Sequence, residues 1–301
     1  MNKPLVSVVL TSYNQLEKLT RAFNSLLDQT YQNVEILISD DFSTDGSREK
    51  IHEWEIEYPG KVVPILQTEN VGIPRNKNSG FKKAKGDFIT YLDGDDIYLP
   101  DKIEKEVLYA LNNPEHDIVY SNFAFCDEEL NILNLWSEER KSMPTGNIFL
   151  DVVLRRFPYN TVFRFELMRK NVLKSINYYD ENIRAFHDWD SRIRYSYKYK
   201  IGYCDNISSC YIQDTDGISK KTKQTLLLKE MRFVLKKNKA LINRLNRDDF
   251  KAMQALDYNL LCKIFASTSI KKDFKYIFSY LKDNPLKTTE IVSLLLKRYK
   301  L

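Results

Sequence analysis

Strand-like and helix-like patterns alternate along the first hundred residues, and this alternation limits the fold more than any other feature of the chain. Apolar runs rich in β-branched residues predict strands near residues 5–10, 34–38, 62–66 and 88–92. Helical spacing of apolar side chains predicts helices near residues 16–27, 51–58 and 73–85. Strands that alternate with helices pair in parallel through right-handed crossovers. The pattern therefore predicts an α/β fold with a mixed, mostly parallel sheet, in which Pro64 marks an edge strand.

Polar side chains follow each of the four predicted strands. The segments after the strands are residues 11–14, 40–41, 70–72 and 93–96. They are rich in carboxylate and amide groups, and Tyr13 adds an aromatic ring. Because ligands of open α/β sheets bind outside the carboxyl ends of the strands, we expect these segments to converge on one ligand-binding rim.

The densest part of this rim is the acidic turn Asp93-Gly94-Asp95-Asp96, directly after a predicted buried strand. Gly94 is expected to relax the backbone between the carboxylates. Like charges this close repel one another unless a positive charge lies among them. Divalent cations take oxygen ligands and keep positions for water or substrate phosphate. The turn therefore predicts a seat for a metal ion, and the alternative is a solvated acidic turn that caps the next helix.

Size and composition describe a globular protein with one large domain, or one domain and a smaller appendage. The 301 residues are 43% hydrophobic and 29% charged. No apolar run approaches the roughly 20 residues of a membrane span, and Met1 is not followed by a signal-peptide core. The cysteines at positions 126, 204, 210 and 262 lack the spacing of a zinc site or a disulfide framework. A reduced, cytoplasmic protein is expected.

Four segments resemble the motifs of a known family in their order and spacing. They are Ser7–Asn14 (SVVLTSYN), Ile38–Ser47 (ISDDFSTDGS), Asn70–Gly80 (NVGIPRNKNSG) and Gly86–Asp96 (GDFITYLDGDD). The chain thereby resembles family 2 of the nucleotide-sugar glycosyltransferases, which have the Rossmann-like, three-layer GT-A fold. The resemblance implies a GT-A domain over residues 1–219, with a nucleotide-binding half at about 1–100 and an acceptor half at about 101–219. A helical C-terminal region is expected over residues 220–301.

The resemblance also implies which residues hold the donor, a nucleotide-diphosphate sugar that is most often a uridine one. The nucleotide-binding residues would be Thr11, Tyr13, Asp41, Arg75 and Asp93. Thr11 and Tyr13 would contact the base, with the Tyr13 ring stacked on it. Asp41 would accept a hydrogen bond from the base or the ribose, and Arg75 would face the base or the phosphates. Asp93 would lie near the ribose.

A metal ion would complete this donor site. Asp95 would bind the Mn²⁺ or Mg²⁺ ion that bridges the diphosphate, and Asn14 and Asp96 are further candidate members of the site. Phe42 stands where the family usually has glycine, so the loop after Asp41 is expected to be stiffer than in other members.

The catalytic base is expected in the segment Ala185–Asp190 (AFHDWD). Transfer with inversion needs a carboxylate that takes the proton of the acceptor hydroxyl. The family places a Glu-Asp pair there, which implies Asp188 as the base, and His187 replaces the glutamate. Asp190 is the rival base, and His187 is a candidate neighbour of the reacting groups. Alternatively, both aspartates are ordinary carboxylates at a helix N-terminus.

Charge divides the chain unevenly. Residues 1–219 carry 26 Lys and Arg against 34 Asp and Glu, whereas residues 220–301 carry 20 against 7. The basic region has three interpretations: a helical cap on the acceptor site, a homodimer interface, or a surface that rests on the anionic inner face of the plasma membrane. Nucleic acid is not an expected partner. Residues 211–219 resemble the loop that closes over donor and acceptor in the family.

Together these features predict a metal-dependent, inverting glycosyltransferase that moves a sugar from a UDP-sugar to a glycan acceptor. The acceptor would belong to a capsule, a cell wall, a lipid-linked oligosaccharide or a glycoprotein. One alternative is a nucleotidyltransferase, but residues 11–15 lack the glycine and the cation that a phosphate loop needs. The other is a catalytically inactive sugar- or nucleic-acid-binding module.

Overall fold

A computed structural model describes residues 3–138, 143–213 and 224–242, together with the single residues 248, 249, 252 and 256. The strands are β1 (Val6–Ser12), β2 (Val34–Asp40), β3 (Val62–Leu66), β4 (Phe88–Asp93), β5 (Ile97–Tyr98), β6 (Ile118–Cys126), β7 (Ile132–Leu135), β8 (Leu167–Arg169) and β9 (Ile201–Ile212). The helices are α1 (Leu16–Leu27), α2 (Ser47–Glu57), α3 (Ile73–Lys83), α4 (Lys102–Asn112), α5 (Phe149–Leu154), α6 (Asn171–Ser175), α7 (His187–Ser196), α9 (Gln224–Lys237) and α10 (Lys239–Ile242), with a 3₁₀ turn at Pro158–Asn160.

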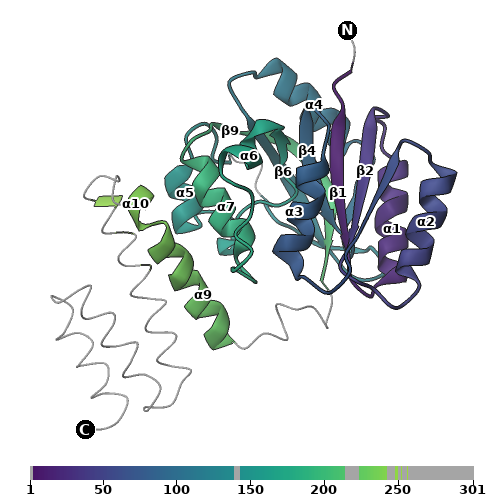
Figure 1. The fold of residues 1–301 in the computed structure, drawn as a ribbon. Helices are drawn as coiled ribbons and strands as arrows, with labels where there is room; N and C mark the ends of the chain where they lie inside the picture. Colours follow the sequence, from purple (N-terminus) through teal and green to yellow (C-terminus); the bar gives the residue numbers. More distant parts are fainter. Residues whose placement is uncertain are drawn as a thin grey trace, which may run out of the picture.

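The described strands form one sheet in the order β3-β2-β1-β4-β8-β6-β9-β5, and β7 pairs with β6 (Figure 1). Strands β1 to β4 are parallel, β8 is antiparallel to both of its neighbours, and β6 and β9 are parallel. The predicted mixed, mostly parallel sheet is confirmed, and the strand of Pro64 lies at an edge of the sheet as expected.

Strand order reverses at β1, which lies between β2 and β4. Such a reversal opens a ligand site beyond the carboxyl ends of the strands, because the connections leave toward opposite sides. In register, Thr11 of β1 lies opposite Asp93 of β4, and Ser12 lies opposite Asp40 of β2. Four polar residues are thereby brought to the same edge.

Helices cover both faces of the sheet in three layers (Figure 1): α1 and α2 lie on one face, and α3 lies on the other. Helix α3 packs very closely on β1, because a Cβ added at Gly80 would lie 2.4 Å from Cγ1 of Val9. This close approach carries the residues of the first turns of α3 to the rim. The three-layer α/β architecture expected from the sequence is confirmed.

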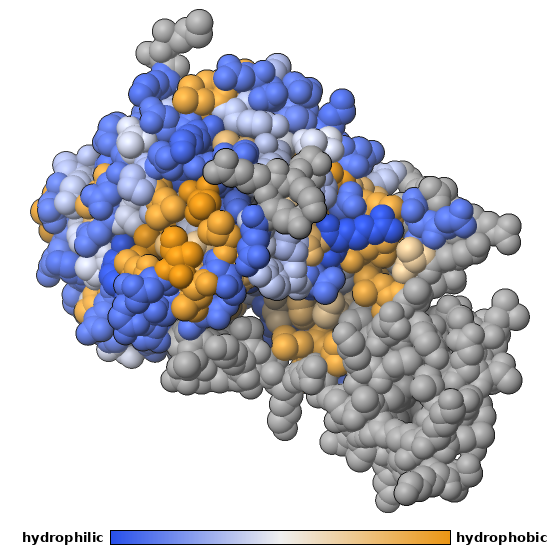
Figure 2. All heavy atoms as spheres, turned by 180° about the vertical axis from the view of Figure 1, so that it is seen from behind, coloured by the Kyte–Doolittle hydropathy of each residue, from blue (hydrophilic) through white to orange (hydrophobic). Residues whose placement is uncertain are grey.

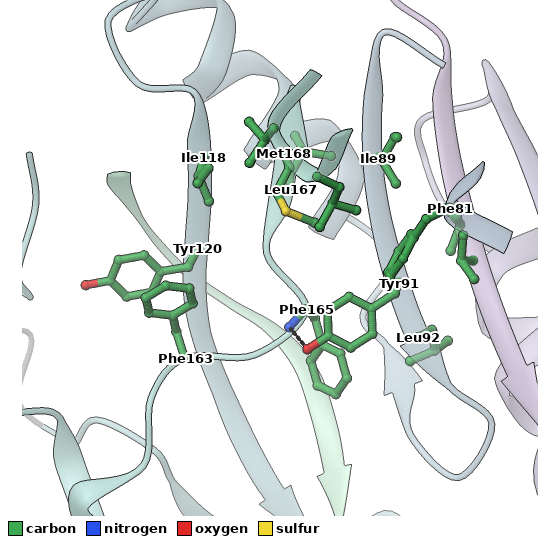
Figure 3. Packing of buried hydrophobic residues seen from close by; sticks show 14 of the residues in the cluster. Phe81, Ile89, Tyr91, Leu92, Ile118, Tyr120, Phe163, Phe165, Leu167 and Met168 are labelled. Carbon is green, nitrogen blue, oxygen red and sulfur yellow. Dashed lines mark hydrogen bonds between the residues drawn. The ribbon is translucent and has the colours of Figure 1, made fainter. Parts of the chain in front are cut away.

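An aromatic core joins the two halves of the sheet (Figure 3). Tyr91 of β4 packs edge-on against Phe81 of α3, with ring centroids 6.4 Å apart, and at a tilt against Phe165, with ring centroids 5.7 Å apart. The Phe165 N–H donates to the Tyr91 hydroxyl at 3.4 Å. Because Tyr91 lies two residues before Asp93, this core holds the acidic turn in place relative to the segment before β8.

Helix α9 docks against residues 180–190 through polar contacts. The Glu230 carboxylate accepts the N–H groups of Arg184, Ala185 and Phe186 at 2.8, 2.6 and 3.0 Å. Lys237 forms an ion pair with Asp180 at 2.6 Å. The expected loop closure over residues 214–219, and nearly all of the C-terminal region beyond residue 242, lie outside the described residues.

The described surface is mostly hydrophilic, with apolar side chains in several areas of the face shown in Figure 2. The hairpin of β6 and β7 exposes Leu130, Ile132 and Leu133. Within the described residues, no helix is both long and apolar enough to span a membrane.

Candidate functional site

Hydrogen bonds join the four polar segments at the carboxyl ends of the strands. Thr11 Oγ1 donates to Asp93 Oδ1 at 3.0 Å, which links the ends of β1 and β4. The Asn14 N–H donates to Ser43 Oγ at 2.9 Å, which links the loops after β1 and β2. The predicted convergence on one rim is therefore confirmed.

Asp41 organises the loop that leads into α3. Its two carboxylate oxygens accept the N–H groups of Val71 and Gly72 at 2.7 and 3.0 Å. Burial raises the pKa of Asp41, and these two hydrogen bonds oppose the rise. Each oxygen keeps a second lone pair, so the expected contact of Asp41 with the base or the ribose stays a prediction.

Two exposed aromatic rings stand after β1 and β2. Tyr13 is 48% exposed and Phe42 is 45% exposed. Exposure of this size fits rings that are free to stack on a flat ligand and does not fit rings that fill the core. Phe42 has a φ of +68°, a left-handed conformation in which a side chain is strained. Asn14 also has a positive φ of 49°, and its side-chain oxygen accepts the Thr44 N–H at 2.8 Å. The loop after Asp41 thus accommodates phenylalanine at the cost of backbone strain.

Asp93 has a cation of its own. Lys77 Nζ lies 2.7 Å from Asp93 Oδ1 and 4.2 Å from the centroid of the Tyr91 ring, and Lys77 is only 3% exposed. Burial alone would raise the pKa of Asp93, but Lys77, with smaller contributions from Thr11 and Arg164, outweighs it and the net shift is downward. Asp93 is therefore ionised and its charge is already compensated by α3.

Asp95 and Asp96 differ from Asp93. Asp96 is 1% exposed and accepts the Ile212 N–H at 2.8 Å, and burial together with the neighbouring aspartates raises its pKa well above the usual range. Burial and the Asp93 charge also raise the pKa of Asp95. In the described part of the chain, no side chain donates a hydrogen bond to the Asp95 carboxylate, so Asp95 offers oxygens that a cation would stabilise.

The residues of this turn fit a metal ion that is shared with a ligand. Among the described residues, no three His, Cys, Asp or Glu side chains gather as a closed metal cage. Mg²⁺ is usually held by one or two carboxylates and by substrate phosphates, so one free aspartate at the rim suffices for this kind of site. Gly94 is needed for space, because its φ is not positive and an added Cβ would lie 2.4 Å from the Thr11 carbonyl oxygen.

Arg75 points toward Glu181, which lies in the predicted acceptor half. Its Nε donates to Glu181 Oε2 at 2.9 Å, and Asn78 donates to the other oxygen of Glu181 at 3.0 Å. The side chain of Arg75 is 56% exposed, so it keeps donors toward solvent. Its expected role at the base or the phosphates stays a prediction.

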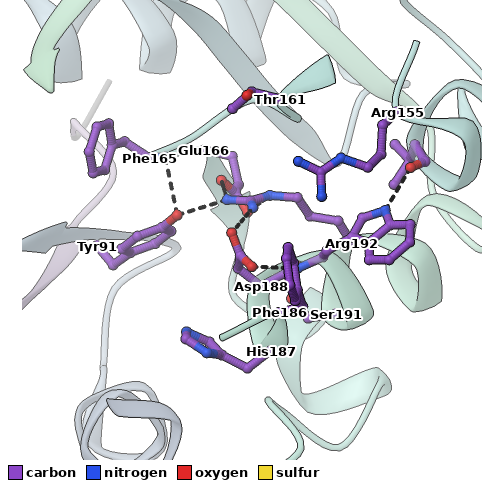
Figure 4. Close-up of polar contacts among 12 residues, drawn as sticks. Tyr91, Arg155, Thr161, Phe165, Glu166, Phe186, His187, Asp188, Ser191 and Arg192 are labelled. Carbon is purple, nitrogen blue, oxygen red and sulfur yellow. Dashed lines mark hydrogen bonds and ion pairs between the residues drawn. The ribbon is translucent and has the colours of Figure 1, made fainter. Parts of the chain in front are cut away.

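Asp188 lies in the first turn of α7 at the centre of a buried network (Figure 4). Arg192 forms an ion pair with Asp188 Oδ2, and its Nη2 also donates to Glu166 Oε2 at 3.0 Å and to the Tyr91 hydroxyl at 2.8 Å. Tyr195 donates to Glu166 at 2.7 Å. Burial opposes ionisation of Asp188, but the nearby cations, Arg192 first, hold its pKa well below the usual range. The Asp188 side chain remains 29% exposed, so a ligand can reach it.

Asp190 lies on another side of α7. It is fully buried and accepts hydrogen bonds from Arg194, Lys237 and Asn238, each at 2.9 Å. These contacts connect α7 to α9, and they occupy the Asp190 carboxylate with structural hydrogen bonds. A carboxylate in this position has no access to an acceptor hydroxyl.

His187 is buried, and its hydrogen bond identifies the tautomer of the imidazole ring. Its Nδ1 lies 2.9 Å from the Arg184 carbonyl oxygen, which can only accept, so Nδ1 carries the proton and Nε2 keeps a lone pair. Burial lowers the pKa of His187, which favours the neutral ring. His187 therefore adds a hydrogen-bond acceptor beside Asp188 without adding charge.

Sequence reasoning missed the cations that surround the aspartates: Lys77, Arg155, Arg164 and Arg192. Only Arg192 carries a local signal, since it lies four residues after Asp188 on one helix. The other three depend on contacts between distant segments.

The comparisons with known proteins agree with this geometry. The sequence model of glycosyl transferase family 2 matches residues 7–172, more than half of the chain. The chain belongs to glycosyl transferase family 2. It is 39% identical over 142 residues to an uncharacterized glycosyltransferase of Haemophilus influenzae, a match that covers 47% of this chain and 56% of that one. It is 34% identical over 124 residues to the UDP-Glc:alpha-D-GlcNAc-diphosphoundecaprenol beta-1,3-glucosyltransferase WfgD of Escherichia coli, covering 41% of this chain and 47% of that one.

Solved structures of family-like folds extend further along the chain. TarS of S. aureus in complex with UDP superposes with a TM-score of 0.60 at 16% identity, covering 86% of this chain and 70% of that one. The mannosyltransferase PcManGT of Pyrobaculum calidifontis in complex with GDP-Man and Mn²⁺ superposes with a TM-score of 0.58 at 13% identity, covering 99% and 85%. At these identities the likeness concerns the fold. The chain spans about half the length of the two curated relatives.

Proposed function

We propose that this chain is an inverting glycosyltransferase that uses a UDP-sugar donor and a divalent cation. The observation that carries the proposal is a set of three carboxylates. Asp93 and Asp95 lie at the carboxyl end of β4, where Asp93 is ionised and no described side chain donates a hydrogen bond to Asp95. Asp188 is ionised and accessible, and its partner Arg192 contacts Tyr91 of β4. Relatives that use or bind UDP or its sugars support uridine as the base. GDP-Man in one structural relative makes guanosine the second candidate.

In this proposal the nucleotide lies over the ends of β1 and β2. Tyr13 stacks on the base, and Thr11, Asp41, Arg75 and Asp93 contact the base, the ribose or the phosphates. Asp95 holds Mn²⁺ or Mg²⁺, which stabilises the negative charge of the leaving diphosphate. Mn²⁺ in the complex of PcManGT supports this part of the proposal. Asn14 and Asp96 are proposed to help shape this donor site.

Asp188 is the proposed general base. Its carboxylate accepts the proton of the acceptor hydroxyl while the hydroxyl oxygen bonds to the anomeric carbon and the bond from that carbon to the diphosphate breaks. Asp190 is not proposed as the base, because its carboxylate is bound by three side chains. His187 is proposed to accept a hydrogen bond from a sugar hydroxyl through Nε2.

The acceptor is proposed to be a growing glycan of a capsule, a cell wall, a lipid-linked oligosaccharide or a glycoprotein. The diphosphoundecaprenol-linked acceptor in the name of one relative supports the lipid-linked member of this set. Residues 220–301 are proposed to serve in one of three ways: as a helical cap on the acceptor site, as a homodimer interface, or as a surface that rests on the inner face of the plasma membrane.

Substitution of Asp188 by Asn tests the proposal. We expect transfer to fall by roughly 10²–10⁴-fold, because general base catalysis has about that value. UDP affinity measured by calorimetry with Mn²⁺ is expected to stay near that of the wild type, because Asp188 is not part of the nucleotide site.

Donor hydrolysis without acceptor separates the proposal from an inactive binding module. A transferase releases UDP slowly from its own UDP-sugar, and a module that only binds sugar releases none. Failure of the wild type to bind any nucleotide sugar, or an Asp188→Asn variant with more than about a tenth of the activity, contradicts the proposal.

A further inference from the structure

Two arginines near Asp188 form no ion pair with a carboxylate among the described residues. Arg164 precedes β8, and its guanidinium stacks 4.1 Å from the centroid of the Tyr211 ring. No hydrogen-bond acceptor in the described part of the chain contacts the Arg164 guanidinium. Arg155 donates one hydrogen bond, from Nε to the Asn160 carbonyl oxygen at 2.6 Å, and its two terminal nitrogens have no acceptor within the described ranges. An arginine carries five N–H donors, so most of the donors of this pair have no partner in the part of the chain that the structure describes.

The two guanidinium groups lie between the acidic turn and the base. Arg164 stacks on Tyr211, and the next residue, Ile212, donates its N–H to Asp96. On the other side, Arg155 stacks over the rings of Phe186 and Trp189, at 5.7 and 5.4 Å from their centroids, which flank Asp188 in the chain. Figure 4 shows the Arg155 guanidinium on the side of Arg192 and Asp188. The transferred sugar and the attacking acceptor sugar must meet in this region.

Arginine side chains gather around the base. Arg192 bridges Glu166 and Asp188, so these two carboxylates already share one buried guanidinium. Arg155 and Arg164 add two positive charges that form no ion pair with a carboxylate in the described part of the chain, although Asp96 and Asp188 lie near enough to raise the pKa of Arg164. Burial lowers the pKa of Arg155, and Arg192 and Arg164 lower it further against the opposing effect of Asp188. His187 adds no negative charge, because its ring is neutral.

Helix α5 fixes the start of the Arg155 side chain. Arg155 closes that helix in the left-handed conformation with which helices commonly end, at a φ of +54°.

We infer that Arg155 and Arg164 bind an anionic group, a carboxylate or a phosphate, carried by the transferred sugar or by the acceptor sugar beside the attacking hydroxyl. The planar guanidinium fork matches both groups through paired hydrogen bonds, and one anion offsets two neighbouring cations. The inference rests on the proposed function and narrows its substrate class to acidic sugars.

Calorimetry with Mn²⁺ tests the donor as the source of the anion. The probes are UDP, UDP-glucose and UDP-glucuronate, which differ only in the sugar. We expect UDP-glucuronate to bind the wild type roughly tenfold to a hundredfold more tightly than UDP-glucose, the range of a charged hydrogen bond. Arg164→Gln is expected to remove the difference and to leave UDP affinity unchanged, and Arg164→Lys is expected to restore part of it.

An NMR titration of the UDP-bound protein tests the acceptor as the source. The probes are methyl glucuronide, glucose 6-phosphate and methyl glucoside, and Arg155→Gln is the variant. Arg169→Gln is the matched control, because Arg169 also stacks on a ring, that of Phe88 at 5.3 Å, at the opposite end of β8 from the site. The control is expected to preserve every preference.

Three outcomes overturn the inference. The first is a wild type that prefers neither acidic donors nor acidic acceptors over the neutral ones. The second is a preference that persists in Arg164→Gln and Arg155→Gln alike. The third is a loss of UDP affinity in Arg164→Gln equal to the loss of UDP-sugar affinity, which means that the arginine reads the diphosphate. A wild type that binds no UDP contradicts the proposed function as well, so the two failures are distinguishable.

Discussion

Single charge partners decide what each aspartate at the rim is able to do. Asp93 is paired with Lys77, Asp188 with Arg192, and Asp190 with Arg194. Asp95 has no such partner among the described residues. Residues of one type are therefore a neutralised rim group, the proposed base, a structural link and a candidate metal ligand, because their neighbours differ.

Gly94→Ala is expected to displace the acidic turn. The added Cβ would lie 2.4 Å from the Thr11 carbonyl oxygen, which is backbone and cannot move aside cheaply. We expect a loss of stability of about 1–3 kcal/mol and weaker binding of UDP with Mn²⁺. Gly60→Ala is the control, since its Cβ meets nothing within 4 Å while its φ of +78° still strains the variant. Equal UDP affinity in both variants would show that the turn tolerates the displacement.

Removal of Arg192 is expected to change the pH dependence of activity. Arg192 holds the pKa of Asp188 below its usual range, so the wild-type base stays ionised as the pH falls. In the double variant Glu166→Gln, Arg192→Met, the pKa of Asp188 rises toward the ordinary aspartate value of about 4. The acid limb of kcat/KM then moves to higher pH, which a pH–rate profile measures. Superimposable profiles of wild type and variant would argue that Asp188 is not the base.

Helices α7 and α9 act as one support for the base. Glu230 of α9 accepts three N–H groups just before α7, where the helix dipole favours a negative charge. Asp190 of α7 is bound by Lys237 and Asn238 at the end of α9. The described part of the basic C-terminal region therefore helps to position Asp188 and is not an independent appendage.

Asp190→Ala is expected to destabilise this support. Removal of the Asp190 carboxylate leaves the Arg194 charge without its partner, whereas Lys237 keeps Asp180, and breaking a buried pair costs about 3–5 kcal/mol. Chemical denaturation measures the change. Asp28→Ala is the control, because Asp28 is an exposed aspartate at the end of α1. A loss no larger than that of the control would show that α9 does not depend on Asp190.

The proposed site spans both halves of the sheet. The end of β1 and its neighbours carry the proposed nucleotide and metal residues, and the segment from Arg155 to Arg192 carries the base and its cations. Tyr91 contacts both, through Phe81, Phe165 and Arg192. Binding at the rim is therefore expected to stabilise the fold of both halves.

UDP with Mn²⁺ is expected to raise the thermal unfolding midpoint more than UDP alone or Mn²⁺ alone. A ligand at about 100 times its Kd adds roughly 2.7 kcal/mol to the free energy of unfolding when it binds only the folded state. A thermal-shift panel of UDP, GDP and their sugars, each with and without Mn²⁺, measures this and identifies the base. An identical midpoint with and without the metal would contradict the role proposed for Asp95.

Much of the proposed nucleotide-binding half, about residues 1–100, was predictable from the sequence. The strands near residues 5–10, 34–38, 62–66 and 88–92 and the helices between them are present, because periodicity and capping are local signals. The polar segments after the strands converge, because parallel strands end at one edge. The position of β9, its pairing with β5 and the place of β8 between β4 and β6 were not predicted, since these pairings join distant segments.

By itself, then, the sequence determined the alternating α/β pattern, the order of the motifs and the family. Each of these depends on residues that are neighbours along the chain. Tertiary structure alone decided which carboxylate meets which cation: Lys77 with Asp93, Glu166 with Arg192, and Arg155 and Arg164 near Asp188. The physical reason is that ionisation depends on burial and on charges a few ångströms away, and folding brings these together from distant parts of the chain.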